Sequence, residues 1–226
     1  MDPRLRAAVD ASIGWYEDMC ALHGVPTRIT AGLWSALAAP PPLHSEVVVV
    51  EPTVTLAQVK GALGGRTPAG VKDSFALIDF AAAGMPLLFT ADWLHRPGAR
   101  TPTTWPGGWR VVDSLAQLDQ WTGHHDTRGV LLPGILAQGH VKVLARYAGD
   151  DMVAGAVTRL GSGIVDISNW WQSRDAPLDW EELVSAVSCL WPERAQVGYA
   201  RDGMRDAALR AGFSVVGPLR VFANAV

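Results

Sequence analysis

The chain has 226 residues and a formal net charge of −3, with 49% hydrophobic and 18% charged residues. This composition is typical of a globular protein with a sizeable core and excludes a disordered chain. The negative charge and the lack of a Lys/Arg run argue against a nucleic-acid partner. The apolar runs are too short for a membrane span, and we expect a cytoplasmic protein without a signal peptide or membrane partner.

The first half alternates helix and strand signals. Asp2 and Pro3 predict the start of an amphipathic helix that ends before Gly24. The elements expected after it are a short strand within 27–37, a strand at 47–50, a helix at 55–63, and strands at 73–80 and 85–94. These elements predict an α/β lobe over residues 1–95.

Residues 96–108 combine prolines, threonines and glycines around Trp105, without periodicity. This composition predicts a linker or surface lid, and hence a boundary before a second domain at 109–226. A helix capped by Asp113 or Ser114 and a short helix at 130–137 are expected next.

The last ninety residues contain strand signals at 140–148, 152–160 and 164–171, a capped helix at 179–191, a strand at 196–200, a helix at 204–211 and a hairpin at 212–223. This order of β-meander, helix, strand, helix and hairpin resembles the GNAT superfamily of acyl-CoA-dependent N-acyltransferases. The resemblance implies an α+β fold, in which a mixed sheet is flanked by helices. The first lobe would be its α/β companion.

The companion lobe contains a short segment that is similar in sequence to part of the second domain, called here the echo. Ala83-Gly84 precedes an apolar strand signal, as Ala211-Gly212 does. Two explanations stay open: a chance match, or a first lobe that is a degenerate copy of the second.

In the GNAT family, acyl-CoA lies in a cleft between the third meander strand and the strand after the helix. A loop of pattern Q/R-x-x-G-x-G/A holds the pyrophosphate through its amides. The matching loop here begins at Gln172, but Asp175 and Pro177 stand at the small-residue positions. The resemblance implies acetyl-CoA or another acyl-CoA as cofactor, and the residues expected to bind it are Trp170, Trp171, Gln172, Ser173 and Arg174.

The position of the family's general-acid tyrosine is Ala208 in this chain. Tyr199, on the preceding strand, is the candidate that could replace it; the alternative is a residue at the edge of the core. Asp166 is the candidate general base, since period-two geometry places it on one strand face with Ser168 and Trp170. The alternative for Asp166 is a solvent-facing strand position.

Trp105, Trp109 and His140 are predicted to contact a small-molecule substrate, and packing between the lobes is the alternative for the two tryptophans. Adjacent residues such as His124 and His125 rarely converge on one ion, so we expect no metal site. The lone Cys20 and Cys189 agree with a reducing compartment, and the sequence is compatible with a homodimer.

Two functions are therefore compatible with the sequence. One is the transfer of an acyl group from a CoA thioester to a small-molecule amine. The other is a degenerate GNAT-like protein without CoA activity, which binds a small ligand or catalyses other chemistry between its lobes.

Overall fold

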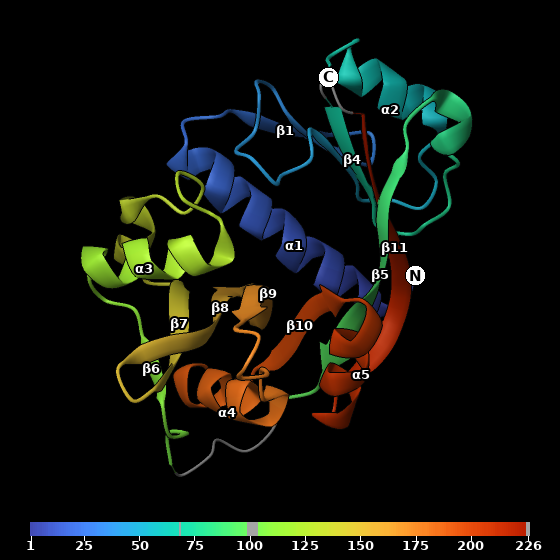
Figure 1. Ribbon diagram of the computed structural model, residues 1–226. Coiled ribbons are helices and arrows are strands. Elements are labelled where there is room, and N and C mark those ends of the chain that lie inside the picture. Colours follow the sequence, from blue (N-terminus) through green and yellow to red (C-terminus); the bar gives the residue numbers. More distant parts are fainter. Residues whose placement is uncertain (68, 99–103, 225–226) are drawn as a thin grey trace.

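The computed structural model describes residues 1–67, 69–98 and 104–224 (Figure 1). The described strands form one mixed sheet of eleven strands, in the order β1-β2-β3-β4-β11-β5-β10-β9-β8-β7-β6. The predicted linker at 96–108 falls partly outside the described residues, and the division of the chain into domains stays a prediction.

The strands of the first half are β1 (Thr27–Thr30), β2 (Leu33–Ala36), β3 (Val47–Val49), β4 (Ala69–Asp73) and β5 (Leu87–Arg96). Those of the second half are β6 (Trp109–Val111), β7 (Val141–Ala148), β8 (Asp151–Gly161), β9 (Ile164–Gln172), β10 (Ala195–Ala200) and β11 (Ser214–Asn224). The helices are α1 (Pro3–Leu22), α2 (Leu56–Leu63), η1 (Ala81–Ala83), α3 (Leu115–His125), η2 (Pro133–Ala137), α4 (Trp180–Leu190) and α5 (Asp202–Arg210). The predicted meander–helix–strand–helix order is confirmed.

Two predicted elements are wrong. Strand β4 ends at Asp73. The carboxylate of Asp73 accepts hydrogen bonds from the amides of Phe75 and Ile78, so the chain turns here instead of forming the expected strand at 73–80. The expected closing hairpin is a single long strand, β11. Its Gly217 lies at a β-bulge against β5 rather than in a turn.

The two halves repeat one order of elements. A β-meander (β1–β3 or β7–β9) is followed by a helix, a strand parallel to the last meander strand, a short helix and a long final strand. The final strands are exchanged: β5 of the first half pairs with β10, and β11 of the second half pairs with β4. Because β5 and β11 also pair with each other, the halves form one continuous sheet.

The echo in the sequence marks the turn before each final strand. Gly84 and Gly212 both have positive φ, at 78° and 90°, and each donates its amide to the third residue before it. The eighth residue after each glycine is Asp92 in β5 and Arg220 in β11, which pair with Ala200 and Asp73. Residues of β4 and β10 can therefore be matched one to one.

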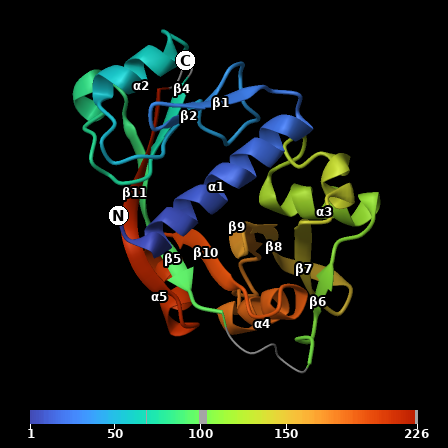
Figure 2. The ribbon, with the colours of Figure 1, turned by 180° about the vertical axis from the view of Figure 1, so that it is seen from behind.

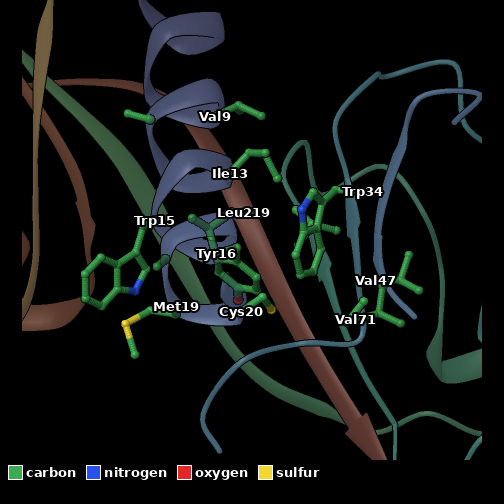
Figure 3. Close-up of a cluster of buried hydrophobic side chains, with 14 of the residues drawn as sticks. Val9, Ile13, Trp15, Tyr16, Met19, Cys20, Trp34, Val47, Val71 and Leu219 are labelled. Atoms are coloured by element: carbon green, nitrogen blue, oxygen red, sulfur yellow. The ribbon is translucent and has the colours of Figure 1, made fainter. Parts of the chain in front are cut away.

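Helix α1 runs diagonally across the molecule, from the β5–β11 pair toward β1 and α3 (Figures 1 and 2). It is long enough to contact both halves, and its apolar side chains between Ala8 and Cys20 are buried. Figure 3 shows its side chain Ile13 directed toward Trp34 of β2, while Trp15 lies on the opposite side of the helix. The Tyr16 ring meets Trp34 edge-on at 5.1 Å. The main core thus joins the two halves through α1.

A second apolar cluster forms where α4 and α5 cover β8, β9 and β10. Val165 and Ile167 of β9 belong to it, whereas Trp171, beyond the strand's midpoint, belongs to the main core. The second half of the sheet is therefore buried on both faces.

Candidate functional site

The candidate site is an opening between the parallel strands β9 and β10. The strands pair from Ile164–Ala195 to Ile167–Gly198, and beyond that point each continues without the other. Gly198 is required at the last pair, because a Cβ there would lie 2.6 Å from the carbonyl oxygen of Ile167. The prediction that these two segments lie side by side and then diverge is confirmed.

A β-bulge in β9 accompanies the divergence. Asn169 has a φ of 48°, and three residues of β9 span the interval that two residues of β8 span. The bulge breaks the period-two alternation, so the prediction that Trp170 shares a face with Asp166 is wrong. Trp170 packs on Trp180 of α4, and Trp171 packs on Trp121 of α3.

One cavity of about 340 Å³, called here the central cavity, lies between α1 and the sheet. Both halves of the chain line it. The polar or ionisable side chains in its lining include Ser12, His44, Lys72, Asp166, Ser168 and Tyr199. The two predicted catalytic residues, Asp166 and Tyr199, are thus brought together in one cavity.

Lys72 is the unexpected member of this group. It is 1% exposed, and its ammonium donates to Ser12 Oγ at 2.9 Å. Its Nζ lies 4.3 Å from the ring centre of Tyr199 and 4.5 Å from that of Trp93, a cation–π arrangement. Burial lowers the pKa of Lys72 to about 7, and the charge of Asp166 opposes that shift.

Asp166 is 4% exposed, and burial raises its pKa to about 6. The charges of Lys72 and Arg159 and a hydrogen bond from Ser168 act in the opposite direction. Arg159 is held in turn by Asp18 of α1, with Nε and Oδ2 2.5 Å apart. A carboxyl group with this pKa changes protonation state just below neutral pH, as a general base requires.

Two further side chains tune the cavity. Burial raises the pKa of Tyr199, so its hydroxyl stays protonated; its ring stacks on Phe89 and meets Trp93 edge-on. Burial lowers the pKa of His44 to about 4, so its imidazole is neutral at pH 7. His44 donates through Nδ1 to the carbonyl of Pro42 at 3.1 Å. The cavity therefore holds neutral proton donors and acceptors beside Lys72 and Asp166.

A second cavity of about 440 Å³, called here the outer cavity, lies between the turn after β9 and helix α5. Trp170 lines both cavities. Gln172 closes the turn by accepting the amide of Leu178 at 2.7 Å, and two cations, Arg201 and Arg210, also line the outer cavity. The Asp179 carboxylate accepts the amides at the start of α4 at 2.9 and 3.1 Å. Two amides at the start of α4 are thus already occupied, and the charged side chains that line the outer cavity are Arg201, Asp202 and Arg210.

The other predicted binding residues are dispersed. Ser173 is held in the turn by Val153, and Arg174 is exposed there; neither residue lines the two cavities. The Trp105 indole donates to the carbonyl of Trp109, and His140 contacts Asp18 at 2.8 Å, outside both linings. The binding roles of these residues stay predictions.

Sequence reasoning missed Lys72 and the arginines of the outer cavity. The available signal for Lys72 was a lone cation next to an apolar strand residue, Val71, ahead of a turn. Within the described ranges, no group of three or more His, Cys, Asp or Glu side chains could hold a metal ion. Among the helices that the structure describes, none has both the length and the apolar character needed to cross a membrane.

Comparison with protein-family models finds no match, and no curated protein matches significantly. Solved structures do match. A GCN5-related N-acetyltransferase from Kribbella flavida superposes with a TM-score of 0.60 at 12% identity, over 95% of each chain. One from Sphaerobacter thermophilus has a TM-score of 0.54 at 10% identity, over 85% of this chain and 76% of its own.

A conserved protein of unknown function from Staphylococcus epidermidis is also similar, with a TM-score of 0.62 at 12% identity. That match covers 88% of this chain and 94% of the other. The chain therefore has the GNAT fold: a large mixed sheet flanked by helices, of the kind found in acyltransferases.

Proposed function

We propose that this protein transfers an acyl group from a CoA thioester to a small-molecule amine. The observation that carries the proposal is the opening between β9 and β10, which has a cavity on each side and Trp170 common to both. The outer cavity would receive the acyl-CoA and the central cavity the amine. The reacting groups would meet at the opening.

The central cavity contains the groups that the reaction needs. Asp166 would accept the proton of the acceptor amine, whose nitrogen attacks the thioester carbonyl. A C–N bond forms as the C–S bond breaks, and Tyr199 would donate a proton to the departing sulfur. Burial brings the pKa of Asp166 to about 6, which suits a base, and it raises the pKa of Tyr199, so that the hydroxyl keeps its proton until the sulfur departs.

The outer cavity offers two cations to a CoA phosphate group, with one acidic residue, Asp202, 3.8 Å from Arg201. Arg201 and Arg210 lie in its lining, and guanidinium groups bind phosphate through paired hydrogen bonds. They would take over a task that loop amides perform in the GNAT pattern, because Pro177 has no amide hydrogen and Asp179 occupies two amides of α4.

Calorimetric titration with acetyl-CoA tests this proposal. We expect binding in the micromolar range, weakened about ten- to a hundredfold by Arg201→Ala or Arg210→Ala, because each removes a charge-assisted contact. Arg28→Ala, at an exposed position on β1, is the matched control and should bind normally. No heat at millimolar acetyl-CoA would instead support a GNAT-fold protein that uses another ligand, an alternative favoured by Asp175, Pro177 and Asp179 in the turn.

A further inference from the structure

Two opposite charges face the central cavity without meeting. Lys72 comes from β4 of the first half and Asp166 from β9 of the second, and both are almost completely buried. Neither takes part in an ion pair with any residue in the described part of the chain. A buried charge without a partner is unfavourable, so this arrangement needs a physical reason.

The surroundings of Lys72 identify what is missing. An ammonium has three N–H donors, and Ser12 Oγ is the one hydrogen-bond acceptor within reach in the described structure. The aromatic rings of Tyr199 and Trp93 stabilise its charge but take no conventional hydrogen bond. A carboxylate entering the cavity would supply the remaining acceptors and the negative charge.

Asp166 has the complementary need. Its carboxylate receives a hydrogen bond from Ser168 and lies close enough to Lys72 for each charge to affect the other, yet no direct bond joins them. A ligand cation placed between the strands could donate to it. The cavity thus offers one anionic and one cationic side chain to the same occupant.

We propose that the acceptor is an amine that also carries a carboxylate, as an amino acid does, with its amine at Asp166 and its carboxylate at Lys72. The apolar part of the ligand would contact Trp15, Phe89 and Val130, which also line the cavity. A volume of about 340 Å³ is near the lower end of ligand pockets, which suits a single small molecule. This inference rests on the proposed acyl transfer and specifies its substrate class.

The architecture agrees with this assignment. Lys72 pairs with Val221 of β11, and Tyr199 pairs with Trp93 of β5; both partners are the ninth residue after the turn glycine of their strand. Corresponding positions of the two halves thus meet in the cavity, one with a cation and one with a phenol. Neither half alone contains both charges.

The test measures binding without acyl-CoA. The standard amino acids are screened at millimolar concentration by thermal shift, and the best ligand is compared calorimetrically with its decarboxylated and its deaminated analogue. We expect each analogue to bind about ten- to a hundredfold more weakly, because each leaves one buried charge unpaired. In Lys72→Met the decarboxylated analogue and the amino acid should bind equally, and in Asp166→Asn the deaminated analogue and the amino acid should bind equally.

Lys60→Met, at an exposed position on α2, is the control and should preserve both preferences. Circular dichroism checks that each variant is folded. Failure of all the amino acids to bind, or equal affinity of the intact protein for the amino acid and its decarboxylated analogue, would overturn the inference. Acyl transfer to amines without a carboxylate would leave the proposed function standing, whereas amino-acid binding without transfer would leave this inference standing.

Discussion

The two halves of this protein share one order of elements but differ at one place. In the first half, β3 and β4 pair from Val47–Val71 to Val49–Asp73. In the second half, the pair that corresponds to Val47–Val71 is Ile167–Gly198, the last before β9 and β10 diverge. The first half is therefore closed where the second is open, and the opening between parallel strands lies in the second half.

The corresponding acidic residues show what this difference means. Glu46 lies one residue before Val47, as Asp166 lies one residue before Ile167. Glu46 accepts the backbone amide of Gly70 and so joins β3 to β4. Asp166 has no such backbone partner among the residues that the structure describes, and it faces the central cavity. A carboxylate used for structure in one half is available for chemistry in the other.

The largest expected effect comes from exchanging these carboxylates for amides. Asp166→Asn removes the proposed base, and the rate of acyl transfer should fall about 10²- to 10⁴-fold, while the protein stays folded. Glu46→Gln should leave the rate within about threefold and lower the free energy of unfolding by about 1 kcal/mol, since it weakens one hydrogen bond. Steady-state kinetics and urea unfolding measure the two effects. The reverse pattern would place the active carboxylate in the closed half.

The second effect concerns the cation supplied by the first half. The pKa of Lys72 is lowered from 10.5 to about 7 by burial, so between these pH values the unfolded chain binds a proton that the folded protein does not. The stability of the native protein should therefore rise with pH across this window. The destabilisation caused by burying the Lys72 charge is at its full value below about pH 7. Lys72→Met should raise the free energy of unfolding by about 3–5 kcal/mol at pH 6–7, a gain that disappears near pH 10.5.

Urea unfolding at several pH values measures this gain, with Lys60→Met as the control for an exposed lysine. The Asp166→Asn background gives the cleaner comparison, because Asp166 attracts the ammonium of Lys72. A loss of stability in Lys72→Met at neutral pH would show that Lys72 has a structural role. A gain in stability with a loss of ligand binding is the signature of a residue kept for function.

The third effect makes the open half resemble the closed one. Asn169 corresponds to Val49 and adopts a φ of 48°, a conformation that asparagine tolerates and β-branched residues avoid. Asn169→Val should destabilise the protein by about 1–2 kcal/mol, because valine is strained at this φ. It should also weaken acetyl-CoA binding, because β9 can avoid the strain by losing the bulge. Asn169→Gly accepts the same φ, and binding should be unchanged. Thermal unfolding and calorimetry distinguish the two variants. Equal stability and equal acetyl-CoA affinity would show that the opening does not depend on the bulge.

Much of the second half was predictable because its signals are local. The turns, the Asp179 cap and the alternating strands are each encoded within a few residues, and the divergence of β9 from β10 followed from the resemblance. The exchange of β5 and β11 was not predictable, because strand partners distant in the chain leave no local pattern. Gly217-Pro218 resembles a turn, yet in the structure it is a bulge within a continuous strand.

The site was predictable only in its second-half members. Asp166 and Tyr199 could be proposed because they belong to strands on either side of the expected cleft. Lys72 could not, since the burial of a lysine depends on α1 and β5, which cover it from distant parts of the chain. The bulge at Asn169 redirects Trp170 and Trp171. It too could not be predicted, because no pattern in the sequence marks the position of the extra residue.

The smallest expected effect compares the helices that follow each meander. Both are capped: Thr55 accepts the amide of Gln58 at the start of α2, and Asp179 accepts two amides at the start of α4. Removing either cap by substitution with Ala should lower the free energy of unfolding by about 0.5–2 kcal/mol. Asp179→Ala should in addition tighten acetyl-CoA binding severalfold, because it frees two amides and removes a negative charge beside the outer cavity. Thr55→Ala should leave that affinity unchanged, and unfolding with calorimetry on both variants measures the difference. If the two variants bind acetyl-CoA with equal affinity, the phosphates do not approach the start of α4. Arg201 and Arg210, which line the outer cavity, would then be the cations that hold them.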